Sequence, residues 1–309
     1  MKKQSLVFVL VVFLGLLLSC TSSPIWADDN LNTYPKDPTL TTGGHFQKLD
    51  GIKDFERSSR LRDRISELRQ EINSIDNDLQ DQTLSKETKA LRRAQQLNLR
   101  DILADCVHDL AIAEGRILKY VPSNVIEGQD SDQYMSVPDE HQNTGNIIVI
   151  KPKESVRRWW TFFANGWQHA AMFSGWNPYR GWKINIIEAS GPNILSRIIL
   201  FEDWINATSF KKLVEKAVLI EFSFTHDELV SMINYHNAHQ VGIKYPSRAT
   251  LPFSKYRTKT FYCSSLVWRA HKSSGRLLDL DDEYSPLMVW PSELFTDSDS
   301  EDNVYAISW

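Results

Sequence analysis

The strongest regular pattern of apolar positions lies in the first half of the chain. Six apolar residues recur at alternating intervals of four and three, with charged residues between them: Leu61, Ile65, Leu68, Ile72, Ile75 and Leu79. This heptad stripe predicts a long helix that begins at about Phe55. A polar stretch at 80–85 separates it from a second helical pattern, which runs from about Lys86 to Lys119. Two such helices most simply form an antiparallel hairpin, and a parallel dimeric coiled coil through the first helix is the alternative.

Beyond a polar stretch at 121–144, which we interpret as a linker, the pattern becomes mixed. Short apolar runs predict strands, and they lie at 147–150, 168–174, 183–190, 194–200 and 217–223. Helical spacing appears at 155–165, after the capping-box residues Thr225 to Glu228, and after Tyr262. This order predicts an α+β domain at 145–309, with an antiparallel sheet and packed helices. The helical hairpin or coiled-coil module at 55–120 precedes it.

The N-terminus has the pattern of an export signal at 1–20. Lys2 and Lys3 precede an apolar run that is too short to span a bilayer comfortably, and Ser19-Cys20 follow it. Leu17-Leu18-Ser19-Cys20 resembles a bacterial lipobox, which would make Cys20 an acylated first residue, and ordinary cleavage after Ala27 is the competitor. Residues 21–54, rich in Thr, Asp, Asn, Pro and Gly, predict a flexible tether. We therefore expect an exported protein, lipid-anchored in the envelope and facing the periplasm, with the outer membrane favoured because Thr21 is not aspartate.

Composition limits the chemistry that the domain can perform. A formal net charge of -4 gives no reason to expect a nucleic acid as partner. Of the three cysteines, Cys106 and Cys263 remain once Cys20 is set aside, and two distant thiols do not indicate a disulfide scaffold. Cys106 lies on the apolar stripe of the second predicted helix and is interpreted as a structural thiol. Cys263 is the candidate for chemistry.

Cys263 lies in the first turn of its predicted helix, where unpaired N–H groups and the helix dipole favour a thiolate. By itself such a residue is more often a core cysteine than a nucleophile. A nucleophile needs a base, and the base needs a residue that orients it. His169 lies on one predicted strand and Glu188 ends the next. If Ser174 pairs with Lys183, His169 falls opposite Glu188, although a one-residue slip would move Glu188 to the other face.

Metal chemistry has less support in the sequence. His236 and His239 are three residues apart on a predicted helix, but no carboxylate or cysteine at a suitable spacing completes a metal site. We therefore expect neither a metal nor another cofactor.

Four segments resemble a known family. They are Gly145-Asn146-Ile147-Ile148-Val149, Gln168-His169-Ala170-Ala171-Met172, Ile187-Glu188-Ala189-Ser190-Gly191 and Phe261-Tyr262-Cys263-Ser264-Ser265-Leu266-Val267. Together they resemble the YiiX-like, circularly permuted papain-fold cysteine hydrolases of the NlpC-type superfamily, which is related to the lecithin–retinol acyltransferases. The resemblance covers roughly 145–298. It implies a permuted papain-like fold in which Cys263 is the nucleophile, His169 its base and Glu188 the residue that orients His169.

Three further residues are tentative candidates for binding the oxyanion or the substrate. Tyr262 precedes the nucleophile and acts with the Cys263 backbone N–H, or else packs at the junction of loop and helix. Gln168 precedes His169, and Tyr245 ends the family landmark Gly242-Ile243-Lys244-Tyr245. The chain departs from the family at Ser265, where an acidic residue is common, and at Pro246, where Asp is frequent. Because of these two departures, the resemblance does not extend to the substrate of the family.

Two functions follow from these observations. The first is an exported thiol hydrolase that cleaves an amide or ester bond through an acyl-enzyme, with a peptidoglycan peptide or an acyl lipid as substrate. The alternative is a non-catalytic envelope scaffold, anchored to the membrane at Cys20. In that case the helical hairpin recruits a helical protein partner or forms a homodimer.

Overall fold

The computed structural model describes residues 45–121, 144–153, 166–177, 183–189, 195–207, 213–246, 259–274, 288–296 and 301–308. Residues 38–309 form one compact unit. The expected export signal, Cys20 and the predicted helix at 155–165 lie outside the described residues. Among the described helices, none combines the length and the apolar character that crossing a membrane requires.

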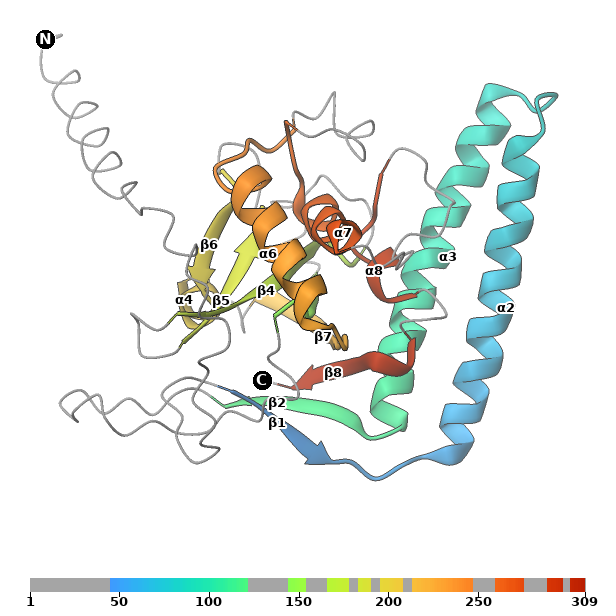
Figure 1. The fold of residues 1–309 in the computed structure, drawn as a ribbon. Helices are drawn as coiled ribbons and strands as arrows, with labels where there is room; N and C mark the ends of the chain where they lie inside the picture. The colour runs from blue at the N-terminus through green and yellow to red at the C-terminus, as the bar shows by residue number, and fades with distance from the viewer. Residues whose placement is uncertain are drawn as a thin grey trace, which may run out of the picture. The chain divides into compact units, whose positions relative to one another are not determined.

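Two long helices, α2 (Phe55–Gln80) and α3 (Lys86–Ala113), match the two helical patterns of the sequence. They lie side by side and are joined by a short turn (Figure 1). Asp54 caps α2 by accepting a hydrogen bond from Arg57 N at 2.9 Å, and Ser85 caps α3 in the same manner. The α2 stripe is buried in one core cluster with apolar residues of α3. The stripe is thus covered within the chain and needs no second copy of α2.

The second helix is shorter than its pattern predicts. It ends at Ala113, and residues 116–119, which we expected to be helical, belong to strand β2 (Arg116–Val121). Gly115 has a φ of 73°, and a Cβ at this position would lie 2.9 Å from the Gly51 carbonyl oxygen, so glycine permits the sharp change of direction. Strand β1 (His45–Asp50) pairs antiparallel with β2. The tether predicted at 21–54 is therefore wrong over 45–50.

A single sheet contains eight strands in the described part of the chain, in the order β1-β2-β8-β7-β3-β4-β5-β6. The remaining strands are β3 (Ile147–Pro152), β4 (His169–Asn177), β5 (Lys183–Glu188), β6 (Arg197–Leu200), β7 (Val214–Ile220) and β8 (Val304–Ser308). Every pairing is antiparallel except β2 with β8, so the sheet is mixed and the prediction of a purely antiparallel sheet is wrong there. The β2–β8 pairing also crosses the boundary predicted at 121–144, which does not separate two compact units.

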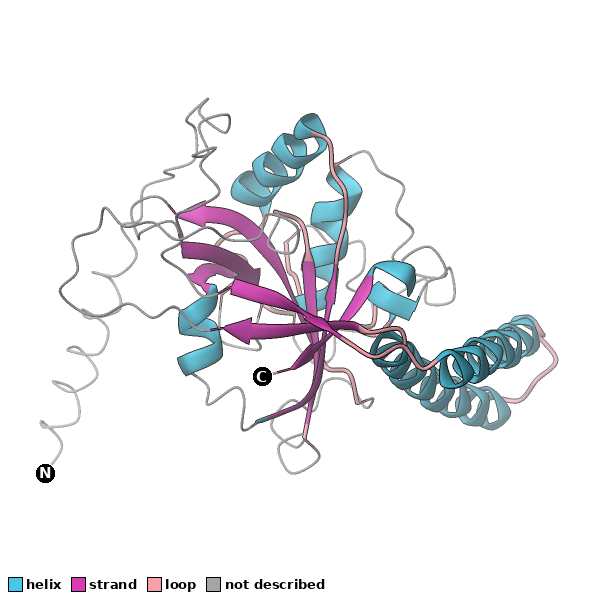
Figure 2. Cartoon of the chain, turned by 90° about the horizontal axis from the view of Figure 1, so that it is seen from below, coloured by secondary structure: helices cyan, strands magenta, loops and turns pink. Residues whose placement is uncertain are grey.

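Helices cover both faces of this sheet (Figure 2). One core cluster joins α2 and α3 with α6 (His226–His239), α7 (Cys263–Ser273) and α8 (Glu293–Thr296), and the other contains α4 (Phe201–Ala207). Strand residues alternate between them, since Val149 lies in the first cluster and Ile148 in the second. The capping box predicted before α6 is present at Thr225 and Glu228.

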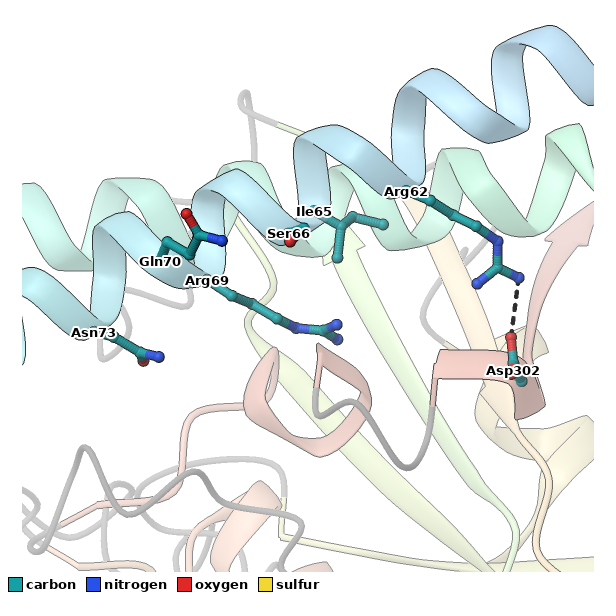
Figure 3. Close-up of a pocket in the computed structure, with 7 residues that line it drawn as sticks. All are labelled: Arg62, Ile65, Ser66, Arg69, Gln70, Asn73 and Asp302. Carbon is teal, nitrogen blue, oxygen red and sulfur yellow. Dashed lines mark hydrogen bonds and ion pairs between the residues drawn. The ribbon is translucent and has the colours of Figure 1, made fainter.

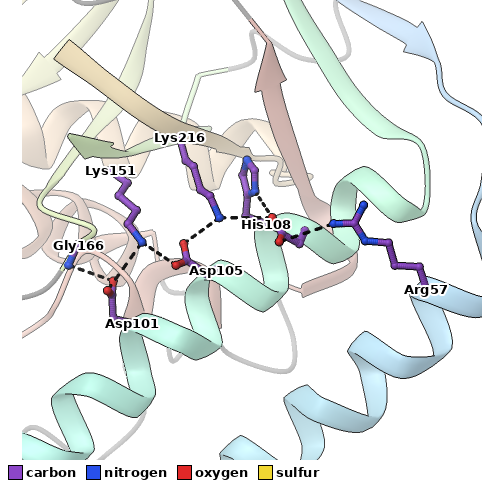
Figure 4. Close-up of polar contacts among 8 residues, drawn as sticks. Arg57, Asp101, Asp105, His108, Lys151, Gly166 and Lys216 are labelled. Carbon is purple, nitrogen blue, oxygen red and sulfur yellow. Dashed lines mark hydrogen bonds and ion pairs between the residues drawn. The ribbon is translucent and has the colours of Figure 1, made fainter. Parts of the chain in front are cut away.

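Charged residues join α3 to the sheet. Asp101, Asp105 and Asp109 follow one another at four-residue intervals, and they face Lys151 of β3 and Lys216 of β7 (Figure 4). Lys151 Nζ lies 2.6 Å from Asp105 Oδ2, and its side chain is only 6% exposed. The row fixes the position of α3 relative to the sheet, because moving α3 away would leave the buried Lys151 charge without its partners.

Candidate active site

Cys263 is the first residue of α7, as the sequence predicts, and only 1% of it is exposed. Tyr262 is the N-cap residue, and its N–H donates to Ser265 Oγ at 3.0 Å. Phe261 N donates to Lys244 O at 3.2 Å, which places the loop before α7 beside the segment that carries Tyr245. The thiol therefore lies at the positive end of an 11-residue helix, where the first backbone N–H groups have no intrahelical partner.

His169 is the first residue of β4, where it is 2% exposed. It pairs with Ile150 of β3, and the neighbouring Gln168 N donates to Ile150 O at 3.0 Å. The imidazole is hydrogen-bonded to Cys263, and its Nε2 lies 3.3 Å from Glu188 Oε2. Nδ1 is therefore the nitrogen that remains for the thiol. The structure thus brings together the three residues that the sequence selects.

The charges around His169 favour its protonated form. Burial lowers the pKa of the imidazole, but the hydrogen bonds and negative charges of Cys263 and Glu188 outweigh this effect and raise the pKa to about 9. Burial likewise raises the pKa of Glu188, whereas His169 and Arg197 lower it to about 2 overall. At neutral pH the site therefore combines a carboxylate with an imidazolium that lies beside the thiol.

Glu188 is held by two residues that the sequence analysis missed. Trp204 Nε1, on α4, donates to Oε2 at 2.7 Å, and Arg197 donates to Oε1 through Nε at 2.9 Å and Nη2 at 2.6 Å. Arg197 is the direct cross-strand partner of Glu188 on β6. The available signal was the opposite charge of Arg197 on the strand predicted at 194–200, but without the strand register it indicated no particular partner.

The predicted register of the β4–β5 pair is wrong by two residues. Met172 pairs with Ile187, so Glu188 comes opposite Ala171 and not opposite His169. An even slip keeps side chains on the same face, and His169 and Glu188 therefore still meet on a diagonal.

The bulge at Ser174 contributes to this outcome. On its far side Gly175 pairs with Asn185, and that pairing, continued without a bulge, would set Glu188 opposite Met172. Met172 faces the other core cluster, away from Trp204 and Glu188. The extra residue in β4 therefore restores the face that Glu188 shares with His169.

The tentative binding residues lie in three different environments. The Tyr262 hydroxyl accepts a hydrogen bond from Val289 N at 2.6 Å, and the residue is fully buried, which favours its packing role. The Gln168 carbonyl oxygen lies 3.8 Å from Cys263 Sγ. Tyr245 packs against the cluster of Tyr262, Cys263 and Met288, and burial with the nearby thiol raises its pKa, so its phenol remains a hydrogen-bond donor.

Two further buried histidines, His236 and His271, have structural partners. His236 is buried, hydrogen-bonds through Nδ1 to Gln240 Oε1 at 3.1 Å, and has its pKa lowered to about 4 by burial. His271 Nε2 donates to Gly145 O at 2.8 Å. Within the described residues no group of three or more His, Cys, Asp or Glu side chains is arranged to hold a metal ion. Cys106 is half-buried on α3, and burial raises the pKa of its thiol.

Comparison with known proteins finds no family model that matches the chain and no curated protein with a similar sequence.

Proposed function

We propose that this chain is a thiol hydrolase that cleaves an amide or ester bond through a Cys263–His169–Glu188 constellation. The observation that carries the proposal is the hydrogen-bonded series from the thiol through the imidazole to a buried carboxylate. A structural cysteine requires neither a protonated imidazole nor an ionised carboxylate in an apolar core, and burying both is costly. The permuted papain-like fold belongs to the same proposal.

The three residues have distinct roles in the reaction. Cys263 Sγ bonds to the carbonyl carbon, the bond to the leaving group breaks, and the leaving amine or alcohol takes the proton of His169. Water then gives a proton to His169 and its hydroxide to the thioester, which releases the acid and restores the thiolate. Glu188 orients the imidazole throughout. The Cys263 N–H and the Tyr245 hydroxyl are our candidates for stabilising the oxyanion.

The surroundings of the thiol favour a substrate with an apolar part. Tyr245, Met288 and Trp290 pack around Cys263, and Met288 is 7% exposed. An acyl lipid, or a peptidoglycan peptide with its aliphatic side chains, suits such a wall. With acylated Cys20 as anchor, the enzyme would act at the envelope, facing the periplasm.

A non-catalytic scaffold remains the second candidate, because a thiol that is 1% exposed needs side chains to move before a substrate reaches it. Labelling with a thiol-directed acyl probe separates the two functions. We expect the full chain and its Cys106→Ala variant to be labelled at Cys263, as read from peptide masses, and Cys263→Ala to lose the label. A label of equal intensity in both variants, or none in the unmodified chain, would reject the hydrolase.

A further inference from the structure

We infer that one turn of α3 sets the distance between Cys263 and His169, and that Arg100 and Asp101 are positioning residues for the reaction. The inference rests on the proposed function, since it concerns the geometry of the same thiol–imidazole pair. Cys263 begins a helix and His169 begins a strand, so the two come from separate elements. Because proton transfer depends on sub-ångström placement, something must fix one element relative to the other.

On the side of Cys263, α3 contacts the segment 288–296, which in turn contacts the start of α7. Arg100 forms an ion pair with Glu293, and both residues are almost fully buried, at 4% and 2% exposure. Glu293 Oε2 also accepts a hydrogen bond from Trp290 N at 2.7 Å. The buried pair therefore holds the start of α8, and through it Trp290, three residues earlier.

The same segment is attached directly to the first turn of α7. Val289 N donates to the Tyr262 hydroxyl at 2.6 Å, and Ser264 Oγ donates to Val289 O at 2.7 Å. Tyr262 and Ser264 flank Cys263 in the sequence, and Met288 packs against the thiol. Any movement of Val289 is thus passed to both neighbours of the nucleophile.

The other end of α8 is held by α2. Arg69 lines a groove of ≈ 400 Å³ on α2 and donates through Nη2 to Thr296 O at 2.8 Å. Figure 3 shows Arg69 extending away from α2, next to Arg62, which pairs with Asp302. Both arginines are engaged with the C-terminal part of the chain, so we interpret the groove as a structural junction.

On the histidine side, Asp101 holds the segment that leads into β4. Its Oδ1 accepts a hydrogen bond from Gly166 N at 3.0 Å, three residues before His169 (Figure 4). Its Oδ2 lies 3.8 Å from Lys151 Nζ, and Lys151 follows the strand partner of His169, Ile150. A Cβ at Gly166 would lie 2.5 Å from Lys151 Cε and 2.7 Å from Asp101 Oδ1, so the backbone approaches α3 as closely as a glycine permits.

The two sides also touch each other against α3. The Trp167 ring packs on Phe295 of α8 with centroids 4.8 Å apart and on His108 of α3 at 6.0 Å. Arg100 and Asp101 are consecutive. The contacts that lead from Arg100 to Cys263, which we call the cysteine arm, and those that lead from Asp101 to His169, the histidine arm, therefore start from one turn of one helix. A rigid helix thus acts as a common support for both reacting groups.

The test compares variants that remove the contacts of α3 with the cysteine arm or with the histidine arm. The double substitution Arg100→Met with Glu293→Gln removes both charges of the buried pair together, and the glutamine still accepts from Trp290 N. Asp76, which Arg100 also attracts, keeps its hydrogen bond from Gln96. Asp101→Ala releases the histidine arm, while Lys151 keeps its partner Asp105. The matched control is Arg92→Ala, which removes an α3 arginine from an exposed pair with Asp78.

The readout is the rate of Cys263 alkylation by iodoacetamide against pH, measured on the folded full chain by peptide mass spectrometry. In the unmodified chain and in Arg92→Ala we expect faster alkylation at about pH 6 than an ordinary thiol shows, because His169, with its pKa raised to about 9, carries its proton at that pH and lies beside Cys263. In both arm variants we expect that rate to fall roughly tenfold or more and the profile to approach that of an ordinary thiol. Arg100→Lys, which keeps the charge, should retain most of the rate.

Thermal unfolding of each variant separates positioning from simple stabilisation. A lower melting temperature with an unchanged pH profile in both arm variants would overturn the inference and leave the proposed hydrolase intact. An ordinary-thiol profile in the unmodified chain would instead overturn the hydrolase, and the positioning role with it.

Discussion

Glu188 shows at the scale of single residues why a buried charge is stable here. It is 2% exposed, and Trp204 and Arg197 donate to its two oxygens. These donors replace water, so the carboxylate stays ionised and can hold one nitrogen of His169. In the proposed reaction Glu188 thus acts on the orientation and charge of the imidazole and not on the substrate.

The titration of His169 is the direct test of this arrangement. We expect its imidazole to titrate at a pKa near 9, because Cys263 and Glu188 outweigh the burial that lowers it. Glu188→Gln removes one negative neighbour and Cys263→Ala removes the other, so each substitution should lower the pKa of His169 by about one unit or more. The measurement is an NMR titration of the His169 Cε1–H resonance.

His236 provides an internal control for that titration. Burial lowers its pKa to about 4, and it hydrogen-bonds to the neutral Gln240, so it should titrate alike in all three proteins. An unaltered His169 pKa in Glu188→Gln would show that the carboxylate does not determine the charge of the imidazole.

At the scale of elements, the α2–α3 pair closes its apolar seam within one chain. Leu68 of α2 is fully buried in the same core cluster as Val107 and Leu110 of α3. Leu91, also on α3, is 72% exposed. The two leucines therefore allow the same substitution to be made inside the seam and outside it.

We expect Leu68→Ala to lower the free energy of unfolding by about 2–5 kcal/mol, because it removes buried methyl groups and leaves a cavity. Leu91→Ala should change it by less than about 0.5 kcal/mol, since its side chain is already in water. Urea denaturation at two protein concentrations measures both effects. A loss in Leu68→Ala that depended on concentration would point to the dimeric coiled coil instead.

At the scale of the whole molecule, the helical pair and the sheet are one folding unit. β2, which follows α3, pairs with β8, and β8 pairs with β7 in the centre of the sheet. The buried charges of Glu293 and Lys151 find their partners on α3. The predicted domain at 145–309 therefore lacks contacts that it needs for its own stability.

A chain shortened to residues 122–309 should consequently fail to unfold in one cooperative transition. It loses the β2 edge of β8 and leaves Glu293 without Arg100, and an unpaired buried charge costs about 3–5 kcal/mol. Circular dichroism during heating, with amide hydrogen exchange, measures this. A sharp transition and protected β8 amides in the fragment would show that the helical pair is an independent module.

The sequence was sufficient where a pattern is local. The heptad stripe predicted α2, the Thr225–Glu228 capping box predicted the start of α6, and short apolar runs located β3 to β7. It failed where the decisive partner is remote. β1 and β2 carry mixed residues that become strands only by pairing with each other and, through β2, with β8. Arg197 and Trp204 acquire a role only once β6 and α4 lie next to Glu188.

For the candidate site, the sequence alone determined which residue types are present and in which elements. Local sequence patterns are enough to place a cysteine at the start of a helix, and a histidine and a glutamate on successive strands. Only the tertiary structure decided that they meet, because the β4–β5 register and the bulge at Ser174 determine which face Glu188 occupies. It also decided that α3 supports both sides of the site, since Arg100 and Asp101 contact segments far away in the chain. Such long-range contacts follow from packing, which no local pattern records.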